Sequence, residues 1–215
     1  MNGALRRLIT DISSGTEAKA RRAEAKLKKL KSPECIEPLL PCLLGWSGFP
    51  SISADSAINV ISSMGENNLV CNFLLKQLRV GNETVRANAA WALKMAPQSK
   101  AIPNLKRYAR NDRNEEVRIW CLHALKVMAW RIPGLGKGIF GILIKAVKDR
   151  SAGIRCAAFE CISHLHDPRC VPLLERALED EDDSISKVHG PSWIRHAKKA
   201  HGGIVKPRKG CDKPI

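Results

Sequence analysis

Four residues in the C-terminal third of the chain have side chains that could hold a metal ion: Cys161, His164, His166 and Cys170. Thiolate sulfur and imidazole nitrogen are the ligands that bind zinc tetrahedrally in proteins. Their spacing matches no recognised zinc motif, and the apolar surroundings of Cys161 are typical of a packed helix. We therefore favour a structural role for this segment, keep zinc as the alternative, and expect no metal and no cofactor.

Nucleophilic catalysis would need a Ser or Cys, a base and an orienting group that converge in one pocket. The sequence contains no nucleophile elbow, no His-Glu-x-x-His pair and no P-loop. The glycine-rich stretch from Gly134 to Gly138 lacks the Walker spacing and a preceding strand, and it is more typical of a hinge between two helical units. These observations favour a protein that is not an enzyme.

The clearest pattern in the chain is an internal repeat. Segments that begin at Val85, Val117 and Ile154 align without gaps, and each consists of an apolar residue, an arginine and an apolar stripe. Small or apolar residues recur four, seven and eight positions after each start, which is the spacing of one buried helical face. Weaker copies begin at Lys19 and Ser53, so the five starts lie 32 to 37 residues apart.

A second helical pattern lies between these helices. Residues 36–40, 102–105 and 171–174 each carry a proline close after an apolar residue, and 70–78 and 140–147 are versions without proline. Proline is tolerated in a first helical turn because its missing N–H would have no partner there. Each unit is therefore predicted to be a helix, a turn and a second helix.

Residues 154–182, which begin Ile-Arg-Cys-Ala-Ala-Phe-Glu-Cys-Ile, resemble the HEAT-like repeat first noted in phycobilisome lyases. The resemblance covers roughly 1–185, is sharp in 80–182 and is weak in 1–70. It implies an all-α fold, a right-handed α–α superhelix of the HEAT/ARM solenoid type, with about five helical hairpins and a C-terminal cap.

The predicted domain organisation follows from these units. The solenoid is expected over 1–185, with units of about 1–31, 32–65, 66–97, 98–130 and 131–168, while 169–185 begin a sixth. Gly190 and Pro191 interrupt the helical pattern of that sixth unit. A basic capping segment is therefore predicted over 186–201, because a terminal repeat needs a polar outer face, and a flexible basic tail over 202–215.

Positions two, six, nine and thirteen after each repeat start lie opposite the buried stripe and are expected to face outward. The resemblance implies that this face lines the concave surface of the solenoid. Aromatic and cationic groups on one surface anchor protein partners or stack on bases. The expected partner-binding residues are Arg21, Lys28, Trp91, Lys94, His123, Lys126, Trp130 and Glu160, with Asp55 and Asn59 in the same row. The alternative is that Trp91 or Trp130 packs at a repeat boundary.

The family's repeats also tend to carry an aspartate in the turn before the second helix that bonds the helix arginine. Asp112 precedes Arg118 by six residues, as Asp149 precedes Arg155. The resemblance therefore implies a turn-bracing ladder of these four residues, with Arg86 as the equivalent arginine of the preceding repeat.

The chain is strongly basic, with 36 Lys and Arg against 21 Asp and Glu in 215 residues and a net charge of +15. Both ends carry most of the surplus, whereas the middle is nearly balanced. No apolar stretch reaches the roughly 20 residues that a membrane span needs, so no membrane association is expected. Eight cysteines without a Cys-x-x-Cys pair and the absence of a signal peptide favour reduced thiols and a cytoplasmic location.

The favoured function is a scaffold that binds a protein partner, because an extended solenoid surface needs no chemistry of its own. The alternative is a nucleic-acid-binding protein, since the basic ends and the Lys and Trp positions would suit a phosphate backbone. The resemblance also extends to proteins that excise alkylated bases from DNA and to lyases that attach chromophores. The only acids in the expected row are Asp55 and Glu160, which is weak support for an enzyme.

Overall fold

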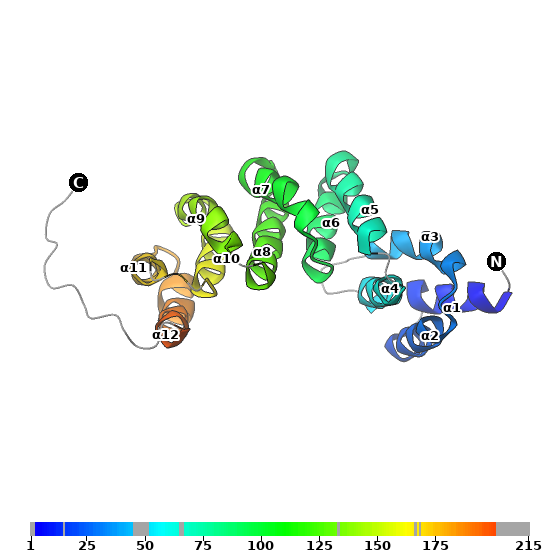
Figure 1. Ribbon diagram of the computed structural model, residues 1–215. Helices are drawn as coiled ribbons and strands as arrows, with labels where there is room; N and C mark the ends of the chain where they lie inside the picture. Colours follow the sequence, from blue (N-terminus) through cyan, green and yellow to red (C-terminus); the bar gives the residue numbers. More distant parts are fainter. Residues whose placement is uncertain are drawn as a thin grey trace, which may run out of the picture. The chain divides into compact units, whose positions relative to one another are not determined.

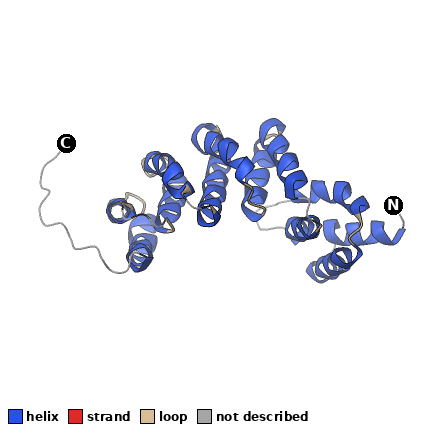
Figure 2. Ribbon diagram, viewed as in Figure 1, coloured by secondary structure: helices blue, strands red, loops and turns tan. Residues whose placement is uncertain are grey.

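The computed structural model describes residues 3–14, 16–44, 52–64, 67–132, 134–165, 167 and 169–200. Within these ranges the regular elements are helices and no strand is present, which confirms the predicted all-α class (Figure 2). The chain divides into two compact units, Met1–Ile132 (unit 1) and Pro133–Ile215 (unit 2). None of the described helices is long and apolar enough to cross a membrane.

Unit 1 is a series of helical hairpins (Figure 1). Its helices are α1 (Gly3–Ser14), α2 (Glu17–Leu30), α3 (Ile36–Leu39), α4 (Ile52–Ser63), α5 (Asn67–Val80), α6 (Glu83–Met95), α7 (Ile102–Asn111) and α8 (Glu115–Arg131), with 3₁₀ turns η1 (Pro33–Cys35), η2 (Leu40–Leu44) and η3 (Ser99–Ala101). The five repeat starts predicted from sequence fall in or immediately beside second helices, four of which, α2, α4, α6 and α8, belong to this unit.

The second helices α6 and α8 begin at side-chain caps. The Asn82 side chain accepts a hydrogen bond from the Val85 N–H at 3.0 Å, and Asn114 accepts one from the Val117 N–H at 3.1 Å. Such a cap satisfies one of the N–H groups that a helix start leaves without a partner. The first turns also carry Glu83 in α6 and Glu115 in α8, where a negative charge interacts favourably with the helix dipole.

Helix α6 occupies the centre of unit 1. It packs against α5, α8, η2 and α4, and seven successive residues from Ala87 to Leu93 are buried. In α8 the positions four, seven and eight after Val117 are Cys121, Ala124 and Leu125, and all three are buried. The four, seven and eight spacing therefore marks the core face, as predicted, but α6 is enclosed on further sides as well.

Unit 2 contains α9 (Leu135–Ala146), α10 (Ala152–Ser163), α11 (Cys170–Glu175), the 3₁₀ turn η4 (Arg176–Glu179), the π-helical turn η5 (Ser184–His189) and α12 (Gly190–Ala200). Helix α12 packs on α10 and α11, and Trp193 stacks on Phe159 with ring centroids 6.0 Å apart. This contact packs the Trp193 ring of α12 against α10, the second helix of the unit.

The sequence predicted that Gly190 and Pro191 interrupt the helical pattern, and this prediction is wrong. Helical turns continue from η5 into α12, with Pro191 in the first turn of α12, where its ring is tolerated. A Cβ at position 190 would lie 3.1 Å from the Ile185 carbonyl oxygen and 3.0 Å from Leu178, so a larger residue there would require these neighbours to shift. The predicted tail over 202–215 lies outside the described residues.

Arginine–aspartate pairs brace the turns, but their partners differ from the predicted ones. Arg86 donates from Nε and Nη2 to the two carboxylate oxygens of Asp112, both at 2.8 Å, so it reaches the aspartate of the next repeat. Arg118 bonds Asp112 only through the backbone carbonyl, at 2.8 Å. The six-residue spacing therefore marks a carbonyl contact, while the carboxylate serves the preceding arginine.

Unit 2 repeats this arrangement. Arg155 donates to both carboxylate oxygens of Asp180, at 2.9 and 2.8 Å, and to the backbone carbonyl of Asp149 at 3.0 Å. The Asp149 carboxylate accepts from the Ser151 N–H at 3.0 Å, at the start of α10. Bidentate guanidinium–carboxylate pairs are strong because two charged hydrogen bonds share one fixed geometry.

Candidate functional site

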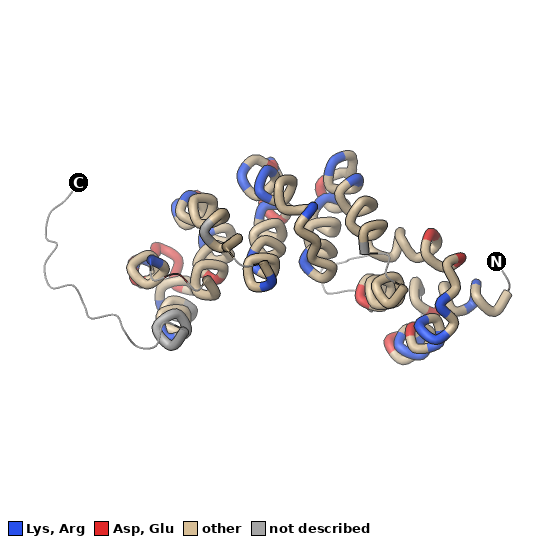
Figure 3. Tube along the Cα trace, viewed as in Figure 1, with Lys and Arg blue, Asp and Glu red and all other residues tan. Residues whose placement is uncertain are grey.

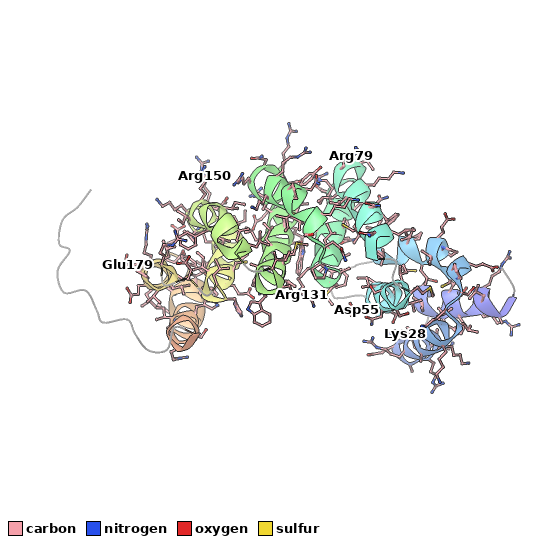
Figure 4. The ribbon with its side chains drawn as sticks, viewed as in Figure 1. Lys28, Asp55, Arg79, Arg131, Arg150 and Glu179 are labelled. Carbon is pink, nitrogen blue, oxygen red and sulfur yellow. The ribbon has the colours of Figure 1, made fainter. Side chains whose placement is uncertain are left out.

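The second helices of unit 1 present one continuous side of that unit. α2 packs against α4, α4 against α6 and α6 against α8, while α5 and α7 lie on the other side (Figure 1). Figure 4 places Lys28, Asp55 and Arg131 on the second-helix side and Arg79 on the opposite side. The expected partner-binding positions of unit 1 therefore share one side.

Trp91 is an exception, and its predicted outward orientation is wrong. The residue is 3% exposed. The cause is the central place of α6, which has neighbours on its outward side as well as along its core stripe. The burial of Trp91 agrees with the alternative interpretation, in which this residue packs inside the solenoid.

Helix α8 carries the aromatic part of the site. Trp130 is 69% exposed near its C-terminal end, and Lys126 and His123 lie half-buried on the preceding turns. Trp120, which the sequence reasoning missed, is also half-buried, and its ring centroid lies 5.5 Å from that of His123. Lys94 of α6 places its Nζ 5.2 Å from the Trp120 centroid, a cation–π distance that joins the two helices.

A polar cluster centred on Glu24 connects α2 to α4. The Glu24 carboxylate accepts hydrogen bonds from Lys28 at 2.9 Å, Ser56 at 2.9 Å and Asn59 at 3.0 Å, and it pairs with Arg21 at 3.4 Å. Burial alone would raise the pKa of Glu24, but these hydrogen bonds and the Lys28 charge outweigh it, so the pKa lies below its ordinary value. Arg21 and Lys28 are thus partly neutralised within their own helix.

Asp55 of α4 has a different environment. Within the described residues its Oδ1 atom is buried and has no hydrogen-bond partner. Burial raises the pKa of Asp55, and the Glu24 charge adds to this, while the charges of Arg21 and Lys94 oppose it. A buried carboxylate oxygen without a donor costs free energy, about 1–3 kcal/mol.

We call Arg21, Lys28, Asp55, Lys94, Trp120, His123, Lys126 and Trp130 the second-helix strip. It combines cations, two partly or largely exposed tryptophans and one carboxylate that lacks a donor. Sequence spacing predicted all of it except Trp120, which lies three positions after the repeat start and so falls outside the predicted outward positions. Met95, at the C-terminal end of α6, was also missed and is 43% exposed.

Glu160 belongs to unit 2, on α10. It is half-buried, and its backbone carbonyl accepts from Ser163 Oγ at 2.8 Å and lies 2.9 Å from His164 Nδ1. Cys161 and Cys170 are buried, and burial raises the pKa of the Cys170 thiol to about 12. No group of three or more potential metal ligands occurs among the described residues, and His166 lies outside them.

Comparison with known proteins identifies the repeat. Residues 52–126 match the HEAT-repeat family. Among solved structures, a designed armadillo repeat protein, YIII(Dq)4CqI, superimposes with a TM-score of 0.51 at 17% identity, covering 92% of this chain and 99% of that one. The complex of CpcE and CpcF of phycocyanin lyase from Nostoc sp. PCC7120 gives 0.49 at 17% identity, covering 93% and 87%. No curated protein matches the chain.

Proposed function

We propose that this HEAT-repeat α-solenoid is a non-catalytic scaffold that binds a protein partner through the second-helix strip of unit 1. The observation that carries the proposal is the exposure of Trp130, at 69%, near the end of α8. A tryptophan buries 150–250 Å² in an interface, and tryptophan and arginine are enriched among residues that dominate binding energy. An exposed Trp on a face with cations is therefore a suitable anchor.

The charges around the anchor define the partner's chemistry. Lys94 of α6 lies over the Trp120 ring of α8, Lys126 is a further cation of α8, and Arg131 ends that helix. A partner segment with an apolar residue against Trp130 and acidic residues facing these cations would bury the tryptophan and complement the charge. Met95, at the C-terminal end of the neighbouring helix α6, is a further exposed apolar residue of unit 1.

Asp55 supports the same site from the α4 side. Its Oδ1 atom lacks a donor among the described residues but is buried, so a backbone N–H or ammonium group of the partner would reach it only once the side chains that cover it move aside. Because burial now raises the pKa of Asp55, a bound donor would lower it again. Partner binding should therefore release protons from this carboxyl near its raised pKa.

The test compares two matched double variants in affinity capture from nuclease-treated lysate of the source organism. Trp130→Ala with Lys126→Glu alters the strip, and Leu30→Ala with Lys29→Glu makes the same kind of change at the exposed end of α2. We expect the strip variant to lose proteins that the control and the wild type retain. With the purified partner, the affinity loss should be about 30-fold or more, the size typical of an anchor residue.

Circular dichroism would show that both variants keep their helix content. The proposal is rejected if both variants capture the same proteins as the wild type. It is also rejected if the purified partner binds the strip variant with unchanged affinity.

A further inference from the structure

The opposite side of unit 1 is a strongly basic surface. Figure 3 shows Lys and Arg on α5, α7 and the adjoining turns. Lys76, Lys100, Lys106 and Arg110 lie there, exposed or half-exposed, and within the described part of the chain no ion pair to an acid is found for them. The helices α5 and α7 themselves carry no Asp or Glu.

A hollow of about 390 Å³ lies between the ends of these helices and the turn that follows α7. Its lining includes four arginines, Arg79, Arg86, Arg107 and Arg113, together with Tyr108 and a single carboxylate, Asp112. Figure 4 shows Arg79 on this side of unit 1, away from the second-helix strip. The hollow therefore has a surplus of three positive charges.

The one carboxylate of the hollow already accepts several hydrogen bonds. Asp112 accepts both hydrogen bonds of Arg86 and a third from the Asn114 N–H at 2.9 Å. Arg86 is thereby fixed, and its Nη1 also donates to the Gly81 carbonyl at 3.1 Å. The charges of Arg79, Arg107 and Arg113 are thus left without compensation from Asp112.

Arg107 is held in a defined place. Its guanidinium carbon lies 4.9 Å from the centroid of the Tyr108 ring, and Nη2 donates to the Tyr108 hydroxyl at 3.2 Å. Glu83 and Glu115 lie in the first turns of α6 and α8, where they line an adjoining hollow with Arg86 and Arg113, and Glu83 accepts from Asn114 Nδ2 at 3.4 Å. The acids therefore gather at the helix starts rather than in the hollow.

Unit 2 contains the equivalent hollow, but its charges are balanced. It surrounds Arg155 and Asp180, and four basic and four acidic side chains line it, among them Glu181 at 3.1 Å from Arg155. The turn geometry alone therefore does not require a positive hollow. The surplus in unit 1 is a property of its side chains beyond the bracing pair.

We propose that the α5–α7 face of unit 1, with the arginine hollow at its centre, binds the phosphate backbone of duplex nucleic acid independently of base sequence. Arginine suits phosphate because its planar donors match two oxygens at once, and several cations along two helices can contact successive phosphates. Tyr108 is half-buried under Arg107, so it offers no platform for stacking bases, which favours a duplex over a single strand.

Other classes of partner, an acidic protein or an anionic membrane, fit this face less well. A protein interface is usually anchored by a buried aromatic or aliphatic side chain, whereas Val80 is the one exposed large hydrophobic residue on α5 and α7. A membrane surface would also need apolar residues that enter the bilayer beside the cations. The face therefore provides many charged donors and very little apolar surface, which is the composition that a phosphodiester backbone requires.

The experiment measures binding of a fluorescein-labelled 20-base-pair duplex by anisotropy from 50 to 300 mM salt. The test variant is Arg79→Gln, Arg110→Gln and Arg113→Gln, and the control is Arg22→Gln, Lys26→Gln and Lys29→Gln, which removes the same charge from exposed positions of α2. We expect the test variant to bind roughly 10- to 100-fold more weakly at 100 mM salt. The slope of log affinity against log salt should fall by about 2 to 3.

The control should lose less than about 3-fold, since generic attraction by net charge is weak when the contacts themselves remain. Equal losses in the two variants would overturn the proposal, as would wild-type affinity in the test variant. Binding of polyglutamate, or of vesicles containing phosphatidylserine, as tight as that of the duplex and lost in the same variant would assign the face to another class of partner. Retention of the protein partner by the test variant would keep this result separate from the second-helix strip.

Discussion

The hollows of unit 1 and unit 2 contain the same kind of arginine–aspartate pair, but the side chains around the pair differ. In each, an arginine four residues after a helix cap binds an aspartate of the next turn with two hydrogen bonds and also donates to a carbonyl of its own turn. The Arg155 side chain of unit 2 is 8% exposed and has a further partner in Glu181, whereas that of Arg86 is 21% exposed. The pair is thus enclosed and charge-balanced in unit 2, but partly open among excess arginines in unit 1.

This difference separates stability from binding. A bidentate pair that recurs at the same place in the repeat is needed to hold consecutive turns together. The additional cations around the pair are not needed for that purpose, because the hollow of unit 2 has the same pair without a surplus of positive charge. Variants of the pair should therefore act on stability, and variants of the surrounding cations on binding.

The largest expected effect is that of Arg155→Ala. It strands the Asp180 carboxylate, whose side chain is 7% exposed, and breaking one side of a buried pair costs about 3–5 kcal/mol. Arg86→Ala should cost less, about 2 kcal/mol, because the Arg86 side chain is already 21% exposed and the charge of Arg118 remains near Asp112. Amide hydrogen exchange measured by mass spectrometry would report α10 for the first variant and α6 for the second. A larger loss in α6 than in α10 would contradict the comparison.

A change in pH is expected to have an intermediate effect on the stability of unit 1, through the carboxyl group of Asp112. Burial alone would raise the pKa of Asp112, but hydrogen bonds from Arg86 and Asn114 and the nearby arginine charges outweigh it, so its pKa lies below the ordinary value. The unfolded chain then takes up protons first as the pH falls. The stabilisation is fully present above about pH 4, near the ordinary pKa, and is lost as the pH falls through the lowered one.

Asp112→Asn should therefore be less stable than the wild type at pH 7 but lose less of its remaining stability between pH 5 and 3. Urea unfolding at a series of pH values measures this. Glu116→Gln, a change at an exposed carboxylate of α8, serves as the control and should keep the wild-type pH dependence. An unchanged acid response in Asp112→Asn would show that this carboxylate does not contribute to it.

The helices themselves could be predicted from sequence because their signals are local. Asparagine caps and apolar residues at four, seven and eight positions identify α6 and α8 whatever surrounds them. The orientation of Trp91 could not be predicted, because it depends on how many neighbours enclose α6. Trp120 was missed for the related reason that one residue of rotation decides whether a side chain at a stripe's margin is buried.

The ladder and the basic face show a second limit. The spacing of Asp112 and Arg118 is visible in the sequence, but it does not reveal that the carbonyl serves Arg118 and the carboxylate serves Arg86. Charge counted along the chain showed a nearly balanced middle. Folding separates those charges, since α5 and α7 carry only cations while the acids occupy the starts of α6 and α8.

The smallest expected effect uses inorganic phosphate to distinguish the two hollows directly. Phosphate should bind among Arg79, Arg107 and Arg113 in unit 1 but find no charge surplus around Arg155 in unit 2. At about five times its Kd it would stabilise the native state of unit 1 by about 1 kcal/mol. Hydrogen exchange in α7 should then slow about 5-fold relative to chloride at equal ionic strength, while exchange in α10 stays unchanged. Equal slowing in both helices would mean that phosphate acts as a general stabilising salt, and the charge surplus of unit 1 would then have no binding consequence at this scale.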